Sequence, residues 1–577
     1  MPKNKRDQLA IEMVNDRFIY ADDGNKDYLR RAVENEELYW NYIDETDHPY
    51  LSNISLPWPY IITESYLGKC IQITAASMPY VHVVEDDDDS RSKARRVERD
   101  ANMVLYKQKW PILAYNGYKG GFKHGTLFLW LKPWGRYNGI EMPILEIMNF
   151  FHVKVNPTIL SLEDPDAYLG YETFLPLDYF NQFKDNPFYK NIDKIVPHQG
   201  DIFTEEEQSI RAFRSLPGLT RDKYSNLVKT WLYWDFKNFI ILTGGDNVIR
   251  DDRENFIGQI PVKVIKPIPI ENEFYGMSIL EEGKDLFAEA NENRNQFNDG
   301  ANLMLNPQYI INRDVCDLKR RNIEARSGNI IWTSDIPNNA VAPLKQDWNL
   351  LAMCLKRQDS IYQDIMNYSN AFPQMRGQPS PGAAETATEF VGMRSAGELR
   401  SDTYNLLLSM MGVESIVEDI VEYKRKFMTL PSKFYYWPER KTQITMPEDY
   451  EGEFTFKAFS AFRGFQEIER KQLIEAMAMV FGGANGAFLP FVTPKTDEWL
   501  DRLLDSFPHI RSPEQLKLSE EEKMMAQAQS MMQQMMLPFA GKGGNEQPAM
   551  GEKAMRPMET EPNSQMGSMI SNEMMRP

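Results

Sequence analysis

The stretch SILEEGKDLFAEANENRNQFNDGANLMLN, residues 278–306, decides the fold. Ser278 is a favourable N-cap, and Glu281 three residues later completes a capping-box pattern, so a helix is predicted to begin there. Such a helix spans roughly 40 Å. Gly283 and Gly300 lower its helix propensity. It is polar and Asn-rich, with a narrow apolar stripe formed by Leu280, Phe287, Ala290, Phe297, Ala301 and Met304. We predict a long polar helix that lies outside the apolar core.

The residues that follow complete a hairpin. Pro307 ends the helix, and residues 308–344 alternate short β-branched runs with turns, which predicts a small β insert. A second helix is predicted from about Trp348 to Tyr368, with an apolar stripe of Leu351, Leu355, Ile361 and Ile365. Helix, β insert and returning helix together predict a helical hairpin with a β head.

A loop and another long helix come next. Residues 371–385, AFPQMRGQPSPGAAE, have the Pro, Gly and Gln content of a mobile loop. Thr386 and Glu389 then form a second capping box, which begins a helix that runs to about residue 428. Gly392, Gly397 and Gly412 lower helix propensity, which permits a bend. An apolar seam predicts that this helix packs lengthwise on a neighbour: Leu399, Leu406, Met410, Val413, Val417, Ile420 and Phe427.

The remaining regions mix helical and strand patterns, so the predicted fold class is α+β. Residues 125–275 contain short aromatic and β-branched runs separated by Gly, Pro, Asn and Asp, and are the largest core candidate. Helix-like patterns are found at 26–43 and 92–114, separated by a segment rich in Pro, Tyr and Trp; β character returns at 430–462, and two shorter helices are predicted within 465–506. From Ser519 onward the Met- and Gln-rich sequence predicts a flexible tail.

Composition excludes several classes of protein. The chain has 577 residues, 42% hydrophobic and 26% charged, which is typical of a folded chain with several folding units. Its three cysteines are too few for a disulfide framework. A net charge of −18 argues against tight nucleic-acid binding, although it suits a surface past which DNA slides. The start of the chain lacks the apolar core of a signal peptide and no later run could span a bilayer, so we expect a protein that is neither secreted nor membrane-inserted.

No motif for catalysis is found. The six histidines lie far apart, without an HExxH pair, and neither GxxxxGK[ST] nor GxSxG occurs. The acidic run Glu85–Asp89 could in principle hold a metal, but neighbouring carboxylates repel one another, and we predict a solvated loop. We therefore expect no enzymatic activity, no metal and no cofactor.

The order of elements from 275 to 428 resembles the portal (head-to-tail connector) proteins of short-tailed bacteriophages. YGMSILEE opens the polar helix, and ETATEF opens the helix after the mobile loop. Upstream, SKARRVERDANMVLYKQ, TLFLWLKPW and LSLEDPDAY are similar to the wing of these proteins, so the resemblance covers roughly residues 50–505. The region after 430 matches only in general character, and the Met-rich tail has no counterpart.

The resemblance implies a portal fold with wing, stem, clip and crown. The implied parts are an N-terminal region and wing (1–277), stem helices (278–306 and 345–370), a β-rich clip (307–344), a tunnel loop (371–385), a wing helix with strands (386–462), crown helices (463–517) and a flexible tail (518–577). It further implies a ring, typically of twelve copies, at one capsid vertex of the virion, assembled in the cytoplasm of a bacterial host. The implied partners are further copies of this chain, the major capsid and scaffold proteins, the large terminase subunit, the tail adaptor and double-stranded DNA passing through the channel, with no membrane.

Three groups of residues are candidate sites. Gln374, Arg376 and Gln378 of the tunnel loop are placed to contact the DNA backbone weakly; an exposed loop without a role is the alternative. The clip has a basic patch of Lys319, Arg320, Arg321 and Arg326, which could touch DNA or an acidic partner, or be simply solvated. Thr386 and Glu389 cap the wing helix.

Two other functions remain open from the sequence. One is another structural virion protein, such as a tail-tube or capsid subunit, which would lack the helix-insert-helix hairpin. The other is a metal-dependent nuclease that uses the acidic run at Asp86–Asp89. Whether residues 278–370 form the helix-insert-helix hairpin in the structure distinguishes another virion structural protein from a portal.

Overall fold

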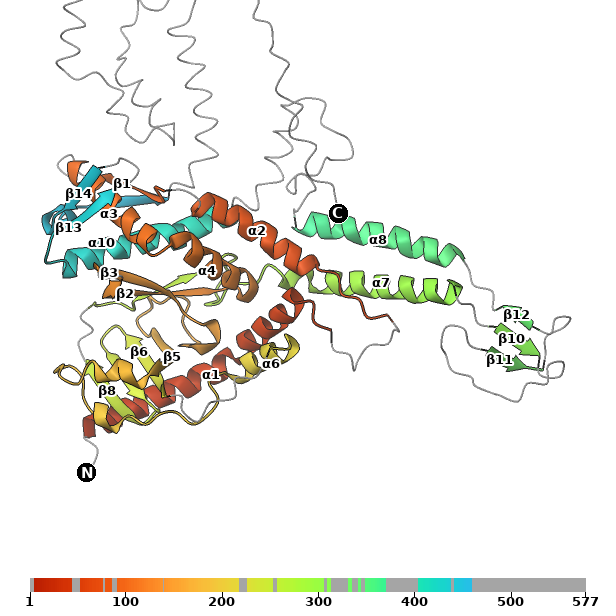
Figure 1. The fold of residues 1–577 in the computed structure, drawn as a ribbon, viewed down its shortest axis with the longest axis horizontal. Coiled ribbons are helices and arrows are strands. Elements are labelled where there is room, and N and C mark those ends of the chain that lie inside the picture. The colour runs from red at the N-terminus through yellow and green to blue at the C-terminus, as the bar shows by residue number, and fades with distance from the viewer. Residues whose placement is uncertain are drawn as a thin grey trace, which may run out of the picture. The chain divides into compact units, whose positions relative to one another are not determined.

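Helices and strands are mixed along the chain, which belongs to the α+β class (Figure 1). The computed structural model describes residues 5–43, 52–75, 78–85, 91–137, 140–216, 226–252, 257–305, 309–312, 330–334, 341–343, 348–369, 403–436 and 441–458. The segments predicted as crown helices and flexible tail, 463–517 and 518–577, lie outside these residues.

An antiparallel five-stranded sheet packs against the first helix, α1 (Lys5–Tyr39). The sheet order is β4-β5-β6-β7-β8, with bounds Val153–Val155, Tyr168–Pro176, Leu227–Asp235, Phe239–Thr243 and Asn247–Asp252. On α1, the buried residues Ala10, Val14, Phe18 and Ala21 recur at helical spacing and pack on one face of the sheet. Gly170 of β5 is required there, because a Cβ at that position would overlap the ring of Phe18.

The other face of this sheet belongs to a second apolar cluster. Strand neighbours alternate between the two faces, so Tyr233 packs towards α1 whereas Leu232 and Trp234 pack into the second cluster. Short elements cover this side: η2 (Phe150–His152), α5 (Leu177–Asn181), η3 (Ile192–Lys194) and α6 (Glu205–Phe213). The strands predicted for 125–275 are therefore observed, but the prediction that this region forms the largest core is wrong, since the largest apolar cluster takes most of its buried residues from outside it.

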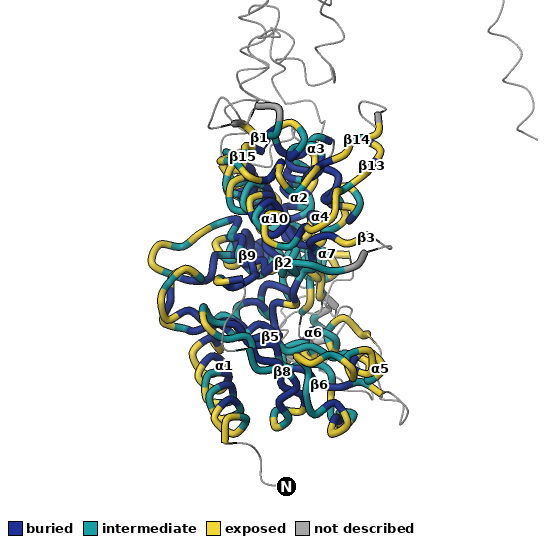
Figure 2. The backbone as a smooth tube through the Cα atoms, turned by 90° about the vertical axis from the view of Figure 1, so that its left-hand side faces the viewer, coloured by how far each residue is buried: buried dark blue, intermediate teal, exposed yellow. Residues whose placement is uncertain are grey.

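The largest core forms around three helices and a three-stranded sheet. The sheet order is β3-β2-β9 (Ile140–Ile147, Leu127–Tyr137, Val262–Ile265), and the helices are α2 (Trp58–Thr74), α3 (Arg91–Lys107) and α4 (Trp110–His124). Leu67, Val97 and Phe122 are among its fully buried residues. Figure 2 shows dark, buried tube running through these elements and paler, exposed tube at the loops.

Residues from the C-terminal third return to this core. Helix α10 (Ser415–Phe427) packs into it, β1 (Val81–Glu85) pairs with β15 (Phe454–Ala458), and β13 (Ser432–Tyr436) pairs with β14 (Lys441–Thr445). A short 3-10 turn, η7 (Pro447–Tyr450), lies between β14 and β15 in the chain. The β character predicted for 430–462 is thus observed in its described part, and Glu85, predicted as loop, is the last residue of β1.

Two helices were under-predicted. The helix predicted from Lys26 begins at Lys5, and the Pro-, Tyr- and Trp-rich segment predicted as a separator contains α2. The prolines misled the prediction, since Pro57 precedes α2 and Pro59 lies in its first turn, where the missing N–H costs nothing.

The seam predicted along 386–428 is wrong in its upstream half. Val413, Val417 and Ile420 are buried as expected, but Leu406 and Met410 are 47% and 53% exposed. The change falls within a π-helical turn, η6 (Ser409–Glu414), which contains both Met410 and Val413; the turn inserts an extra residue and rotates the preceding residues relative to the following ones. The bend allowed at Gly412 falls within this turn, and the start of the predicted helix, with Thr386 and Glu389, lies outside the described residues.

Candidate functional site: the helical hairpin and its root

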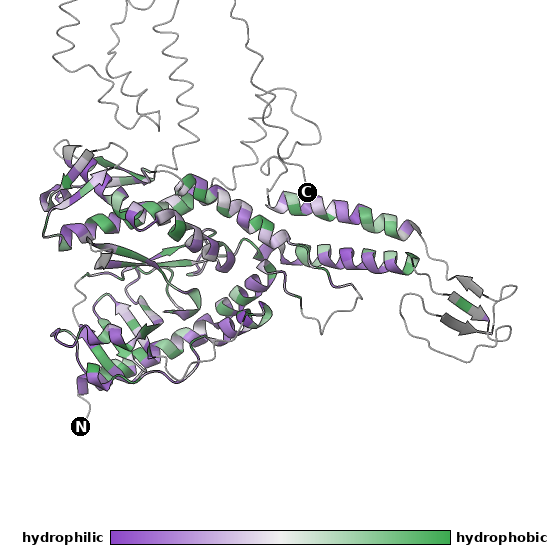
Figure 3. Cartoon of the chain, in the orientation of Figure 1, coloured by the Kyte–Doolittle hydropathy of each residue, from purple (hydrophilic) through white to green (hydrophobic). Residues whose placement is uncertain are grey.

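The hairpin consists of α7 (Lys284–Leu305) and α8 (Trp348–Ser369), which lie side by side (Figure 1). Asn293, buried between them, donates to the carbonyl of Cys354 at 3.1 Å and to Gln358 Oε1 at 3.0 Å. Arg357 of α8 pairs with Glu289 of α7 at 2.9 Å, on the exposed side. Figure 3 shows the polar character of α7, so specific polar contacts contribute to joining the two helices.

Two glycines of the polar stretch allow close approach within the hairpin. A Cβ at Gly283 would lie 2.7 Å from ring atoms of Phe287 and of Tyr368, and one at Gly300 would lie 3.2 Å from Leu351 Cδ2. The sequence marked these glycines as weak points of a helix. At Gly283, in the turn before α7, the rings of Phe287 and Tyr368 leave no room for a side chain, and at Gly300 α7 and α8 lie so close that a Cβ would require Leu351 to shift.

The start of the polar helix differs from its prediction. Ser278 Oγ accepts from the amide of Leu280, and the amide of Ser278 donates to Glu281 Oε1, so only half of the expected capping box forms. A 3-10 turn, η4 (Glu281–Gly283), precedes α7, which begins six residues later than predicted. Ser278 Oγ also donates to the carbonyl of Phe122, which ties it to the end of α4 and away from the Glu281 amide.

The base of the hairpin is anchored in the main core, which corrects the prediction of a helix wholly outside it. Leu280, Phe287 and Ala290 are each at most 2% exposed and belong to the main apolar cluster. Tyr368 at the end of α8 donates to the carbonyl of Ile279, and Tyr66 of α2 donates to that of Ser369 at 2.6 Å. We call this meeting point, residues 276–283 with 368–369, the hairpin root. A shallow hollow lies at the root, lined in part by Tyr66, Tyr368 and Tyr404.

An extended segment, residues 52–56, lies along α7. The amides of Ser52, Ile54 and Leu56 donate to side-chain oxygens of Asp299, Asn295 and Asn291, each at 2.8 Å. We call this segment the strap. It accounts for two of the five asparagines of α7, Asn291 and Asn295, whose side chains bind backbone of the same chain.

At its far end the hairpin carries a small sheet in the order β11-β10-β12 (Figure 1). Its strands are Ile330–Thr333, Tyr309–Asn312 and Val341–Pro343; β10 is parallel to β11 and antiparallel to β12. The basic residues Lys319, Arg320, Arg321 and Arg326 lie outside the described residues, as do Gln374, Arg376 and Gln378 of the predicted tunnel loop. The structure therefore does not bring these candidate residues together or separate them.

A buried ion pair joins α3 to α10. Lys424 and Asp100 are 3% and 2% exposed, and the Lys424 ammonium contacts the Asp100 carboxylate, which also accepts from Tyr450 and, at 3.2 Å, from Ser432. Burial and the charge of Asp100 raise the pKa of the Tyr450 hydroxyl, which stays protonated as a donor. No sequence signal marks this pair, whose members are 324 positions apart.

A second buried cluster joins α1 to α4. Glu36 accepts from Lys123 and, at 2.8 Å, from His124. Burial opposes ionisation of Glu36, but these two donors outweigh it and hold its pKa well below the usual range. Burial lowers the pKa of His124, in spite of its hydrogen bond to Glu36. At neutral pH Glu36 is therefore a carboxylate and His124 a neutral imidazole, while burial lowers the pKa of Lys123 in spite of its contact with Glu36.

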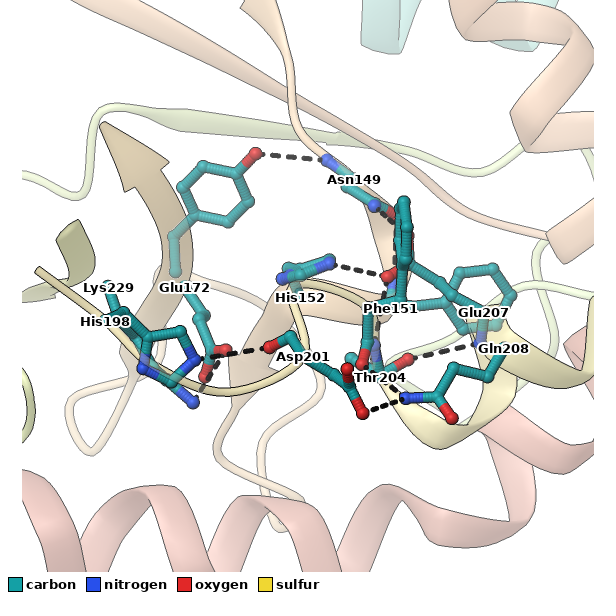
Figure 4. A network of polar contacts seen from close by, with 12 residues as sticks. Asn149, Phe151, His152, Glu172, His198, Asp201, Thr204, Glu207, Gln208 and Lys229 are labelled. Carbon is teal, nitrogen blue, oxygen red and sulfur yellow. Dashed lines mark hydrogen bonds and ion pairs between the residues drawn. The ribbon is translucent and has the colours of Figure 1, made fainter. Parts of the chain in front are cut away.

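A third network anchors α6 (Figure 4). His152 Nε2 lies 2.8 Å from Glu207 Oε2, and Asn149 donates to the other oxygen of Glu207. The Thr204 hydroxyl accepts from the Glu207 amide while Glu207 reaches back to the Thr204 amide, which is a complete capping box. This His–Glu pair is largely buried and fixes the N-terminal end of α6.

Searches for other kinds of site were negative in the described parts of the chain. No group of three His, Cys, Asp or Glu residues there is arranged to hold a metal ion. Among the same residues no helix is both long and apolar enough to cross a membrane. No model of a known protein family matches the chain, and no curated protein matches it either.

Proposed function

We propose that this chain is the portal protein of a tailed bacteriophage, the subunit of a ring that forms the DNA channel at one capsid vertex. It serves in genome packaging, retention and ejection, and docks the terminase and the tail adaptor. The observation that carries the proposal is the hairpin: two long helices leave and re-enter the core at one root and carry a three-stranded sheet between them. A portal stem and clip have this order.

The surface of the hairpin supports association with further copies. Met353 and Leu355 on α8 are 65% and 48% exposed, and Leu305 at the end of α7 is 77% exposed. Apolar side chains in such a position gain free energy by packing against a neighbour. Closed rings form from head-to-tail interfaces of this kind. The net charge of −18 supports a channel wall that does not retain DNA.

The first test is negative-stain electron microscopy of the full-length protein, viewed along the particle axis. We expect symmetric rings with a central hole wide enough for duplex DNA, roughly 20 Å. A filament or sheet would point to another virion structural protein, and a compact dimer would refute the portal assignment.

A paired substitution tests the role of the hairpin. Met353→Lys with Leu355→Lys is expected to abolish rings while the circular dichroism spectrum stays unchanged, because both side chains are exposed in the isolated chain. Ile112→Lys on α4 is the matched control, since Ile112 is 56% exposed and lies on another element. Rings that persist in the double variant would contradict a hairpin interface.

A further inference from the structure

The strap and α7 have matching spacings. The accepting residues Asn291, Asn295 and Asp299 are four positions apart, which is a rise of about 6 Å per step along a helix. Two residues of an extended chain advance about 6.5 Å. Every second amide of the strap therefore meets the next helical turn, and the strap runs antiparallel to α7.

Asn295 contacts the strap as a strand residue would. Its Oδ1 accepts from the amide of Ile54 at 2.8 Å, and its Nδ2 donates to the carbonyl of the same residue at 3.3 Å. A primary amide offers the donor and acceptor of a peptide group, so this pair reproduces the two-bond exchange between opposed residues of antiparallel strands. Asn295 is 2% exposed with the strap in place.

The row of acceptors has one register only. The next positions at the same spacing are Phe287, which is buried in the core, and Leu303, and neither side chain can accept a hydrogen bond. Most of the contacts are to the strap backbone; the exception is Ser55 Oγ, 3.5 Å from Asn291 Nδ2. The side chain of Ile54 is 41% exposed and takes little part.

We propose that the α7 face formed by Asn291, Asn295 and Asp299 is a binding site for an extended polypeptide backbone, which in this chain is filled by its own residues 52–56. The ligand class is an extended segment with three free alternate amides, held mainly through its backbone; one side-chain contact is added by Leu56, which packs against the main apolar cluster. The site goes beyond ring formation, since it is complete within a single copy.

The test is to empty the site and refill it in trans. In full-length protein, Ile54→Pro removes the central amide of the strap, and Asn53→Pro is the matched control because the amide of residue 53 lies between two paired positions. A labelled peptide of residues 51–57 is expected to bind the Ile54→Pro protein, and not the wild type or the Asn53→Pro protein.

Peptides with N-methyl groups define the contact further. Methylation at Ile54 and Leu56 is expected to weaken binding at least about tenfold, whereas methylation at Asn53 and Ser55 leaves it nearly unchanged. Adding Asn295→Ala to the Ile54→Pro protein is expected to abolish binding. Equal binding to all proteins, or no binding to a folded Ile54→Pro protein, would overturn the proposal.

Amide hydrogen exchange of the wild type provides a test that needs no folded variant. Slow exchange is expected at residues 52, 54 and 56 and fast exchange at 53 and 55. Uniform exchange along the segment would overturn the proposal. The peptide-binding and hydrogen-exchange tests do not depend on whether the chain forms rings. A failure of the binding site can therefore be distinguished from a failure of the portal function.

Discussion

The body of the protein and its hairpin are stabilised differently. In the body, sheets and helices bury aromatic and aliphatic side chains, and the charges inside it occur as closed groups such as Asp100 with Lys424. In the hairpin, Phe287, Ile361 and Ile365 near the base join the main apolar cluster. Farther out the helices meet through Asn293 and at Gly300, and the strap is held by amide hydrogen bonds. The body thus depends mainly on the apolar surface that it buries, whereas the outer part of the hairpin depends more on specific polar contacts.

The largest effect is expected from breaking the buried ion pair of the body. Asp100→Ala leaves Lys424 charged and 3% exposed, which should lower the free energy of unfolding by about 3–5 kcal/mol. Chemical denaturation measures this loss. The double variant Asp100→Ala with Lys424→Met should recover much of it, and equal loss in both variants would show that the charge is not the cause.

A cavity in the apolar core should cost somewhat less. Leu242 is fully buried between α1 and the five-stranded sheet, so Leu242→Ala is expected to lower stability by about 3 kcal/mol. Leu355→Ala on the hairpin, 48% exposed, should change the stability of the isolated chain by at most about 0.5 kcal/mol. Similar losses for the two leucines would remove the distinction between body and hairpin.

The hairpin should be sensitive to one added methyl group. Gly283→Ala places a carbon 2.7 Å from the rings of Phe287 and Tyr368, with an expected cost of about 1–3 kcal/mol. Gly68→Ala is the control, because Gly68 lies in α2 with open space around it and should stabilise by about 0.5–1 kcal/mol. Thermal unfolding of both variants measures these changes in stability. Stabilisation by Gly283→Ala would contradict close packing at the root.

The smallest expected effect concerns acid. The lowered pKa of His124 means that, below its ordinary value of 6.5, the unfolded chain binds a proton that the folded chain does not, so stability falls as pH decreases. The lowered pKa of Glu36 acts in the same direction at lower pH. His124→Gln keeps a donor but does not titrate, and should flatten the dependence of Tm on pH between about 7 and 5. An unchanged slope would show that His124 is not responsible.

The local sequence pattern predicted which segments are helices or strands better than it predicted which of them contact one another. The strand runs of 125–275 and the second hairpin helix follow from periodicity, and both are observed. The phase of the helix around Gly412 could not be predicted, because a π-helical turn depends on what packs against it. The contacts that anchor the hairpin root join residues such as Tyr66 and Ser369, 303 positions apart, and no local signal reports such a pair.

The polar residues of α7 could be predicted in part from the sequence. Their Asn content correctly indicated a helix that is more polar than an ordinary core helix. The four-residue spacing of Asn291, Asn295 and Asp299 is also visible in the sequence. The sequence predicted only a polar helix outside the apolar core, and did not indicate that backbone of the same chain occupies this face. Nothing in residues 52–56 alone indicates that they are extended or that their amides need partners.

The antiparallel strap also has a mechanical consequence. The three hydrogen bonds that its amides donate to α7 are equal in length, 2.8 Å each, and spaced along the helix axis. A force that pulls the hairpin along that axis shears all three bonds at once, whereas a force that lifts one end of the strap peels them one after another. The attachment is therefore strong against axial load and weak against lateral load.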